Sequence, residues 1–311
     1  MRSALLSLLG PTPLSRRKAL WGLALIAPNT LGLLFFFGLP VLMAFRISLQ
    51  EWNGIKPPQF VGIDNFQHLL NDPKFEQALT NTFKLIGLTV PFELVLALGV
   101  AILLNQPLHG RSILRTIYFL PVITSTVAAA VVWTSLFQPR YGLLSELLGP
   151  FGLGETKWLV DPGLVLIPIG IVAIWQRIGF DMVIFLAGLQ AIPAVLYEAA
   201  IIDGANRWQR FRHVTLPMLS PTTFLVMILA IISAFQIFDQ VYVITLRTVP
   251  GGVGGSATTL TYYLYRTAFT HSQFGYASAV ALVLFGIILA VTVFQLTIQR
   301  YWVYYEAEPG R

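Results

Sequence analysis

Six long apolar stretches alternate with polar segments along the chain. They cover Ala19–Phe45, Leu85–Leu104, Thr116–Phe137, Gly163–Ala187, Thr222–Leu246 and Ala277–Gln299. A helix needs about 20 mostly apolar residues to cross a bilayer, and a backbone in lipid must pair its polar groups within the segment. The pattern therefore predicts an all-α polytopic membrane protein with six transmembrane helices.

Composition agrees with this prediction. The 311 residues are 56% hydrophobic and only 11% charged, with a mean hydropathy of +0.72. A soluble domain of this size could not hide so much apolar surface. The absence of cysteine excludes disulfides, thiol catalysis and cysteine-based metal sites. The four histidines, His68, His109, His213 and His271, are scattered along the chain and predict no metal site.

The first apolar stretch follows Arg16, Arg17 and Lys18, as the core of a signal peptide would. It is much longer than the roughly 7–15 residues of a signal core, and no small-x-small cleavage site closes it. We therefore expect a retained helix.

The distribution of Lys and Arg sets the orientation. If the N-terminus is cytoplasmic, the inner segments 1–18, 105–115, 188–221 and 300–311 hold 11 Lys and Arg against 4 acidic residues, and the outer segments 8 against 7. Basic loops remain in the cytoplasm, and the net charge of +6 suits anionic lipid rather than nucleic acid. We expect cytoplasmic tails over 1–18 and 300–311 and a six-helix domain over 19–299.

The predicted outer segments contain further signals. Phe60–Phe83 has a helix start at Asp72-Pro73, and Tyr141–Trp158 reads as a short helix followed by a Gly-rich turn. Both fit amphipathic pieces at the outer surface, and ordinary loops covering helix ends fit equally well. The Gly-rich stretch Val249–Gly255 has no following Lys, so we expect a flexible outer loop and not a phosphate loop.

One compact polar segment stands between the fourth and fifth stretches. Pro193 precedes a helical run over Ala194–Ile202, and Asp203-Gly204 gives a tight turn because Gly tolerates positive φ. Asp203 or Asn206 can cap a second helix over Arg207–Leu216. The residues predict a cytoplasmic helix-turn-helix, and an amphipathic linker lying on the membrane surface is the simpler alternative.

The same segment carries a motif. Glu198-Ala-Ala, two residues, Asp203-Gly-Ala, then Phe211 and Leu216-Pro217 resemble the EAA loop of permease subunits of binding-protein-dependent ABC importers. The resemblance covers roughly residues 20–300. The flanking sequences similar to the carbohydrate-uptake branch are "FVGIDNF", "NTF" (Asn81–Phe83), "FLAGLQAIP" (Phe185–Pro193), "LTYYLYRTAF" (Leu260–Phe269) and "FGYASAVALVLF".

This resemblance implies that the loop over 194–217 transmits the closure of separate ATPase subunits. The matching positions are Glu198, Ala199, Asp203, Gly204 and Ala205, and Arg207 beside them is also expected to contact the ATPase. It also implies a second permease of similar fold, two ATPases that hold ATP and Mg, and an extracellular or periplasmic binding protein, all at a bacterial cytoplasmic membrane. The chain lacks a G-x-x-x-x-G-K-[ST] phosphate loop, so we expect no catalysis and no cofactor of its own.

Four charged residues fall within the apolar stretches: Glu93, Arg177, Asp181 and Asp239. Such groups are costly in a membrane and usually face a cavity or a partner. Arg177 and Asp181 are four residues apart and can pair on one helix face. Ser233, Gln236, Ile237 and Gln240 have a spacing that predicts one polar helix face.

In maltose-type members of the family, parts of the fourth and fifth helices hold the sugar. The matching positions here, together with Arg177 and Asp181, are Gly179, Met182, Ser233, Gln236, Ile237 and Gln240. The resemblance implies that these residues line a solute path, and packing between helices is the alternative for each. Met182 and Ile237 stand where a maltose binder has polar or aromatic groups, so the sugar itself is left open.

Two other classes of protein compete with the importer. An intramembrane enzyme could use the buried carboxylates, and a secondary transporter would show internal repeats and more spans. The EAA segment favours the importer, because neither competitor has a use for an ATPase dock. A sugar is the expected solute. Glycerol phosphate or another polyol phosphate is the alternative solute. It would require an unpaired cation in the cavity, and Arg177 is the only basic residue within the apolar stretches.

Overall fold

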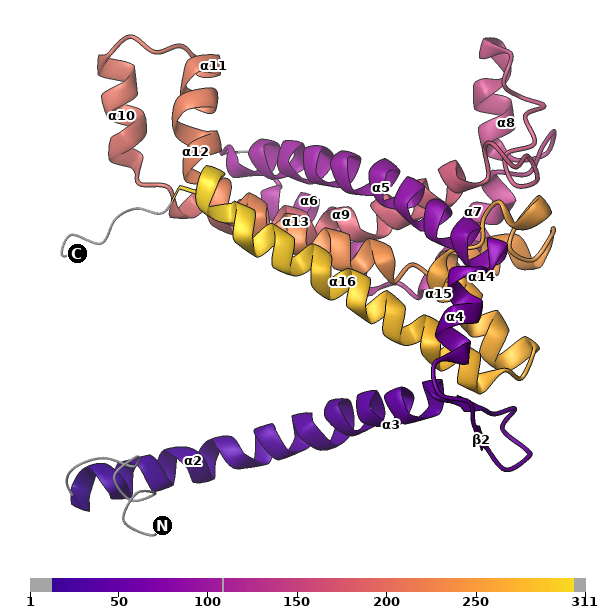
Figure 1. Cartoon of the computed structure of the whole chain (residues 1–311). Helices are drawn as coiled ribbons and strands as arrows, with labels where there is room; N and C mark the ends of the chain where they lie inside the picture. The colour runs from indigo at the N-terminus through magenta and orange to yellow at the C-terminus, as the bar shows by residue number, and fades with distance from the viewer. Residues whose placement is uncertain (1–12, 108, 305–311) are drawn as a thin grey trace.

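The computed structural model describes residues 13–107 and 109–304 and is almost entirely helical (Figure 1). Four helices are long and apolar enough to cross a membrane, or six if each of two bent pairs is one span. The helices are α2 (Pro13–Leu33), α3 (Leu39–Ser48), α4 (Asp64–Leu70), α5 (Pro73–Asn105), α6 (Arg111–Ile123), α7 (Thr126–Leu136), α8 (Leu143–Leu148), α9 (Leu166–Ala191), α10 (Ala194–Ile202), α11 (Arg207–Arg210), α12 (Leu216–Met218), α13 (Ser220–Phe235), α14 (Asp239–Leu246), α15 (Leu260–Tyr265) and α16 (Phe274–Trp302).

Short irregular elements complete the chain. π-Helical turns join neighbouring helices at Leu34–Gly38, Phe211–Thr215 and Arg266–Thr270, and 3₁₀ turns lie at Gly149–Phe151 and Val253–Gly255. Strands β1 (Gln50–Glu51) and β2 (Gln59–Phe60) form one antiparallel pair. The all-α prediction is confirmed. Most of the predicted tail 1–18 and residues 305–311 of the predicted tail 300–311 lie outside the described residues.

The core of the bundle is the packing of α5 along α9, with α13 and α6 beside them. Small residues permit this approach: Ala97 and Ala101 of α5 are fully buried beside Met182 and Phe185 of α9. The first helix is different. α3 contacts α16, whereas α2 runs away from the bundle (Figure 1), and its apolar side chains are exposed.

The third apolar stretch is not one helix, as predicted, but two. α6 and α7 meet at a bend of 98°. Thr124 and Ser125 between them are extended, the Thr124 hydroxyl donates to the Pro121 carbonyl at 2.6 Å, and Ser125 caps α7. Pro121, Thr124 and Ser125 lie inside a continuous apolar stretch, so apolar length alone predicts that they are helix interior. All three residue types nevertheless favour a helix boundary.

The fifth stretch is also broken, and its prediction as one helix is wrong. α13 ends at Phe235 and α14 begins at Asp239. Two threonines just before and within α15 satisfy the freed carbonyls: Thr261 donates to Phe235 at 2.8 Å and Thr259 donates to Ile237 at 3.2 Å. Irregular backbone at this depth requires such partners, and they come from 22 to 26 residues away in the sequence, beyond the reach of a local pattern.

The predicted helix start at Asp72-Pro73 is confirmed, and this helix continues without interruption through the second apolar stretch, which therefore does not begin a helix of its own near Leu85. Asp72 caps it by accepting the Lys74 N–H at 2.9 Å, and Pro73 occupies the first turn, where its missing N–H is harmless. The polar first turns of α5 bind the Gly-rich loop over 249–255. Gln77 donates to the Gly254 carbonyl and Asn81 donates to those of Gly255 and Thr258. That loop, expected to be flexible, is held to α5 by two of these hydrogen bonds, and the third binds Thr258 just after it.

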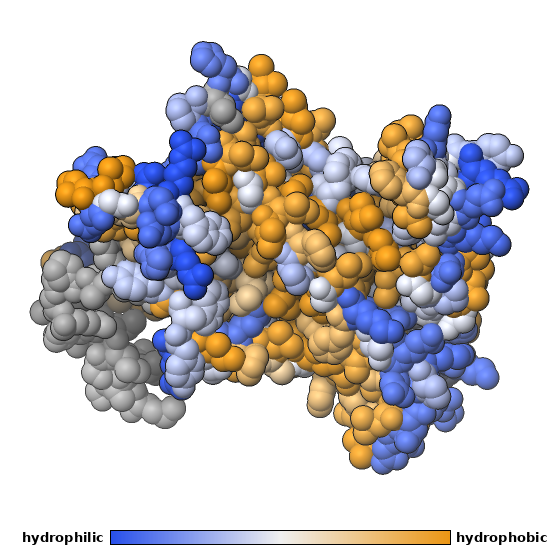
Figure 2. Space-filling view, turned by 90° about the horizontal axis from the view of Figure 1, so that it is seen from above, coloured by the Kyte–Doolittle hydropathy of each residue, from blue (hydrophilic) through white to orange (hydrophobic). Residues whose placement is uncertain are grey.

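The two ends of the molecule differ. The α10–α11 hairpin projects at one end, and α8, α15 and the strand pair lie at the other (Figure 1). Hydrophobic atoms cover the middle of the surface, and hydrophilic atoms gather mainly toward the two ends (Figure 2). This is the distribution expected of a protein whose middle lies in hydrocarbon.

Asp72 joins three helices at the end opposite the hairpin. Its carboxylate accepts the hydroxyls of Tyr263 in α15 and Tyr276 in α16, the latter at 2.7 Å. Burial acts to raise the pKa of Asp72, but these hydrogen bonds and that of the Lys74 N–H outweigh it. The pKa therefore lies below its ordinary value of 3.8.

We expect Asp72→Asn to lower the melting temperature of the detergent-purified protein at pH 7. The amide still caps α5, but a charged acceptor is lost, which costs about 1–3 kcal/mol. A depressed carboxyl pKa stabilises the fold above the unfolded-state value, and this stabilisation disappears as the pH falls through the folded-state value. The melting temperatures should converge below about pH 3.8. Asp64→Asn, an exposed control in α4, should change nothing. A gap that stays constant with pH would contradict a role of the charge.

Candidate functional site

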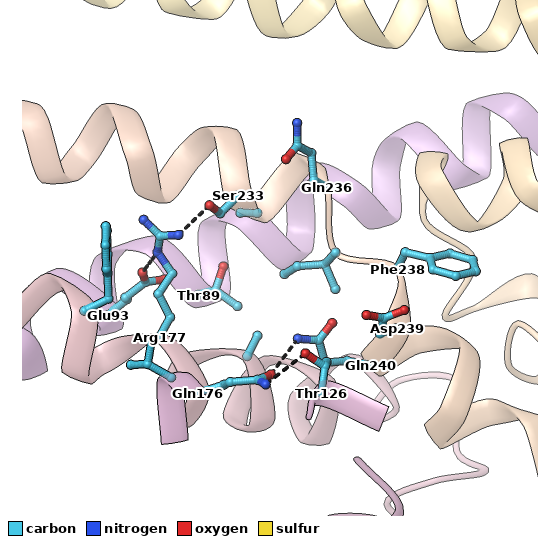
Figure 3. A pocket seen from close by; sticks show the side chains of 15 residues that line it. Thr89, Glu93, Thr126, Gln176, Arg177, Ser233, Gln236, Phe238, Asp239 and Gln240 are labelled. Carbon is cyan, nitrogen blue, oxygen red and sulfur yellow. Dashed lines mark hydrogen bonds and ion pairs between the residues drawn. The ribbon is translucent and has the colours of Figure 1, made fainter. Parts of the chain in front are cut away.

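A polar cavity lies where the two broken stretches meet the straight helices (Figure 3). Its volume is about 490 Å³. It lies in the middle of the bundle, and both helix breaks contribute to it. The lining residues are Thr89 and Glu93 from α5, Val122 from α6, Thr126 from α7, Ala173, Gln176, Arg177 and Phe180 from α9, Ser233 and Ala234 from α13, Gln236, Ile237 and Phe238 from the break, and Asp239 and Gln240 from α14.

Arg177 is the centre of the electrostatics of this cavity. Its Nε lies 2.6 Å from Glu93 Oε1 and 3.3 Å from Asp181 Oδ2, and a terminal nitrogen donates to the Ser233 hydroxyl at 2.5 Å. Asp181 is fully buried and Glu93 is 3% exposed. Two carboxylates thus flank one guanidinium, which is oriented by α5, α9 and α13 together. The cluster offers no free positive charge to a solute.

Amide and hydroxyl groups form a second hydrogen-bonded line across the cavity. Gln176 donates to the Thr126 hydroxyl at 2.9 Å, and Gln240 donates to the Gln176 carbonyl oxygen at 3.2 Å. Figure 3 shows these three side chains on the opposite side of the cavity from Ser233 and Gln236. Amide groups present both donors and acceptors, so the two sides can hydrogen-bond a ligand rich in hydroxyl groups.

The predicted path residues are distributed over two regions. Arg177, Ser233, Gln236, Ile237 and Gln240 line the cavity. The prediction that four of them share one helix face is wrong, because α13 ends at Phe235; the break brings them to the cavity instead. Their grouping arises from the tertiary fold rather than from helical spacing.

Gly179, Asp181 and Met182 do not line the cavity. Asp181 lies behind Arg177, and Met182 is fully buried in the core against α5. Gly179 packs on α6: a Cβ there would lie 2.1 Å from the Tyr118 carbonyl oxygen. For Gly179 and Met182 the geometry agrees with the packing alternative.

Several lining residues were not singled out from the sequence. Thr89 and Thr126 are ordinary residues for membrane helices, and the Thr89 hydroxyl also bonds the Leu85 carbonyl of its own helix. They carry no signal of their own. Gln176 does carry one, because a polar amide within an apolar stretch needs a hydrogen-bond partner. Phe238 reaches the cavity through a helix break that its local sequence does not reveal.

The hairpin has the predicted helix-turn-helix form. α10 ends at Ile202 with Asp203 as its C-cap, Gly204 adopts φ +79°, and Asn206 caps α11 in a reciprocal capping box with Gln209. Between the two candidate caps, the structure therefore uses Asn206. Tyr197 and Thr215 link the two arms through their hydroxyl groups at 3.0 Å.

The tip of the hairpin exposes large apolar side chains. Ile202 is 85% exposed and Trp208 65% exposed. In the described residues, no side-chain hydrogen bond or ion pair is formed by Glu198, Asp203 or Arg207. Exposed apolar side chains rimmed by free charges are typical of an interaction surface.

Comparisons with known proteins agree on one family. A family model described as binding-protein-dependent transport system inner membrane component matches residues 76–302. The trehalose/maltose transport system permease protein MalF of Thermococcus litoralis is 35% identical, over 93% of this chain and 96% of that protein. The arabinooligosaccharides transport system permease protein AraP of Bacillus subtilis is 35% identical, over 87% of this chain and 85% of that one.

A solved structure has the same fold. One chain of a bacterial ABC transporter involved in the import of the acidic polysaccharide alginate superposes with a TM-score of 0.77. The similarity covers 91% of this chain and 96% of that chain at 23% sequence identity. At this identity the likeness concerns the fold alone.

We expect Arg177→Met to destabilise the protein by about 3–5 kcal/mol, because it leaves Glu93 and Asp181 buried without their cation. Adding Glu93→Gln to this variant should recover part of the loss, since one uncompensated charge is removed. Melting temperatures in detergent, arranged as a double-mutant cycle, measure the coupling. Arg140→Ala is the control, because Arg140 and its partner Glu155 are 69% and 80% exposed and such pairs contribute little. Additive losses in the cycle would contradict the cluster.

Proposed function

The chain belongs to the family of binding-protein-dependent transport system inner membrane components, and from this premise we propose that it is the permease subunit of an ATP-driven sugar importer. In this proposal it forms one half of the translocation path. An extracellular or periplasmic binding protein delivers the sugar, and separate ATPase subunits, which hold ATP and Mg, drive alternating access. The chain itself performs no catalysis.

The proposed solute class rests on one observation: the charge of the Arg177 guanidinium is neutralised within the protein. Arg177 is the one cation among the cavity-lining residues, and its charge is already matched by Glu93 and Asp181. Asp239 adds a further carboxylate. Gln176, Gln236 and Gln240 supply amide donors and acceptors. A solute with many hydroxyl groups and no charge fits this lining best.

The relatives support the same class. At 35% identity over most of both chains, the trehalose/maltose and arabinooligosaccharide permeases are close enough for a sugar substrate to be the natural extension. Which sugar it is depends on cavity side chains that differ between such proteins.

A polyol phosphate such as glycerol phosphate is the alternative solute. A phosphate group needs an unpaired guanidinium, ammonium or cluster of backbone N–H groups. Within the lining described above, the single arginine is committed to two carboxylates, and Asp239 would repel an anion. The electrostatics therefore disfavour this alternative.

The α10–α11 hairpin is the proposed contact with the ATPase. Its exposed tip combines Ile202 and Trp208 with the free charges of Glu198, Asp203 and Arg207. Gly204, at φ +79°, permits the sharp elbow between the arms. A groove in a partner that takes up the apolar tip and pairs these charges would account for every one of these features.

We expect the reconstituted importer to take up neutral oligosaccharides and to leave glycerol phosphate outside. A panel of labelled glucose and arabinose oligosaccharides and glycerol 3-phosphate measures this selectivity. Gln240→Ala, which removes two possible hydrogen bonds to the sugar, should slow uptake about five- to tenfold. Gln67→Ala, an exposed glutamine of α4, should not. Uptake of the phosphate in preference to every sugar would reverse the assignment of the solute.

We expect Arg207→Glu and Gly204→Asp to uncouple ATP hydrolysis from sugar uptake without unfolding the protein. Arg207 is exposed, and Gly204 has open space around it, so only the local backbone of the elbow is strained. Uptake and ATP hydrolysis by the complete importer in vesicles give the ratio of sugar imported to ATP consumed.

Arg300→Glu, at the hairpin end but outside the hairpin, is the matched control.

Because the chain has no cysteine, Ile202→Cys can also be cross-linked directly. It should form a product with the ATPase subunit, whereas Leu147→Cys at the far end should not. Normal coupling in both hairpin variants, without a cross-link at Ile202→Cys, would exclude the docking role.

A further inference from the structure

Six aromatic side chains form a continuous row from the cavity to the end of the molecule opposite the hairpin. The ring centroids are separated by 4.9 Å between Phe238 and Tyr265, 5.3 Å between Tyr265 and Phe269, 5.9 Å between Phe269 and Phe274, and 5.6 Å between Phe274 and Trp52. Tyr242 stands beside the inner end, 5.6 Å from both Phe238 and Tyr265. We call these six residues the aromatic row.

The aromatic row lies at the surface and is not core. Phe269 is 65% exposed, and the other five rings are half-buried. Tyr262 supports Phe238 and Tyr242 from behind and is only 3% exposed, as a core residue should be. The six rings come from separate pieces of chain: β1 and its loop, the break before α14, α14 itself, α15 with its π-helical turn, and the start of α16. No single helical period aligns them.

The row is continuous with the cavity. Phe238 lines the cavity and is at the same time the first ring of the row. In Figure 3 its ring points away from Arg177, at the end of the cavity beside Asp239. A molecule that leaves the row at Phe238 therefore meets Asp239 and Gln240 next. An aromatic belt at the membrane interface would surround the protein at one depth, whereas this row leads into a polar chamber.

Aromatic faces suit the apolar C–H faces of sugar rings, and tyrosine hydroxyls suit their O–H groups. The row itself carries no charge, so an uncharged chain can move from ring to ring without breaking an ion pair. On the premise of the proposed function, we propose that the aromatic row is the entry path of the importer, on which a neutral oligosaccharide stacks ring by ring before its leading sugar enters the cavity.

The importer, reconstituted in vesicles with its partner subunits and loaded binding protein, tests this path. The probes are neutral di- and trisaccharides of glucose and of arabinose. In the double variant Tyr265→Leu/Phe269→Leu, we expect imported trisaccharide per ATP hydrolysed to fall at least fivefold, because two stacking contacts are lost. The disaccharide, which covers fewer rings, should change less than twofold. Phe294→Leu, which removes an exposed ring of α16 outside the row, should behave like wild type.

Occupancy of the row can be measured directly. Thr270→Cys introduces a unique thiol beside Phe269, and its labelling by a membrane-impermeant maleimide should slow at least twofold under transport of trisaccharide. Leu147→Cys, at the same end of the molecule, should label at an unchanged rate. Labelling that is blocked by the bilayer but insensitive to sugar would make the row a lipid-facing belt and overturn the path.

The two proposals fail separately. If the wild-type importer takes up sugars and the row variants match it at both chain lengths, the entry path is wrong and the sugar importer stands. If the wild type takes up none of the saccharides, the proposed function falls and the entry path with it.

Discussion

The ion pairs of Arg177 are the constraint on which the site depends. A guanidinium in the middle of a membrane bundle must be matched, because an isolated charge there is costly. Here Glu93 of α5 and Asp181 of α9 match it, and Ser233 of α13 accepts a further hydrogen bond. The same contacts that hold three helices together remove the positive charge from the cavity. The stability of the bundle and the solute class proposed above thus depend on the same ion pairs.

The two helix breaks give the cavity its shape. In an unbroken helix, consecutive side chains point in different directions around the axis. The break after Phe235 lets neighbouring residues such as Gln236 and Phe238 line the same cavity. The free carbonyls need donors, and Thr259 and Thr261 provide them. The bend of 98° between α6 and α7 brings Thr126 to the other side. At both breaks, the irregular backbone lies beside the cavity, and its freed carbonyls at the second break are hydrogen-bonded.

Apolar length located every membrane stretch, and turn chemistry located the hairpin, because both are local properties. Asp203-Gly204 and Asn206 specify the elbow through backbone preferences alone. The second break was not predictable in this way, since the groups that stabilise it lie more than 20 residues away. The first break has local signals in Pro121, Thr124 and Ser125, which apolar length alone does not take into account. The prediction of one helix face was wrong because of the second break, although its four residues do meet in the cavity: Ser233, Gln236, Ile237 and Gln240. Gly179 and Met182 matched a family position but serve packing, which depends on the neighbouring helix.

The chain path links the hairpin to the cavity on both sides. α9, which carries Gln176 and Arg177, ends at Ala191, and only Ile192 and Pro193 separate it from α10. The other arm runs through α11 and α12 and bends by 65° into α13, which carries Ser233. The Arg177–Ser233 hydrogen bond connects α9 and α13 at the cavity, so the two helices that continue into the hairpin are also joined to each other. A partner that rotates the hairpin as a rigid body must therefore move α9 and α13 together or break that bond. Because Glu93 of α5 also holds Arg177, a shift of α9 against α5 would change the cavity lining at its most polar point. Under the proposed function, this is how movement of the hairpin would change the affinity of the cavity for its solute.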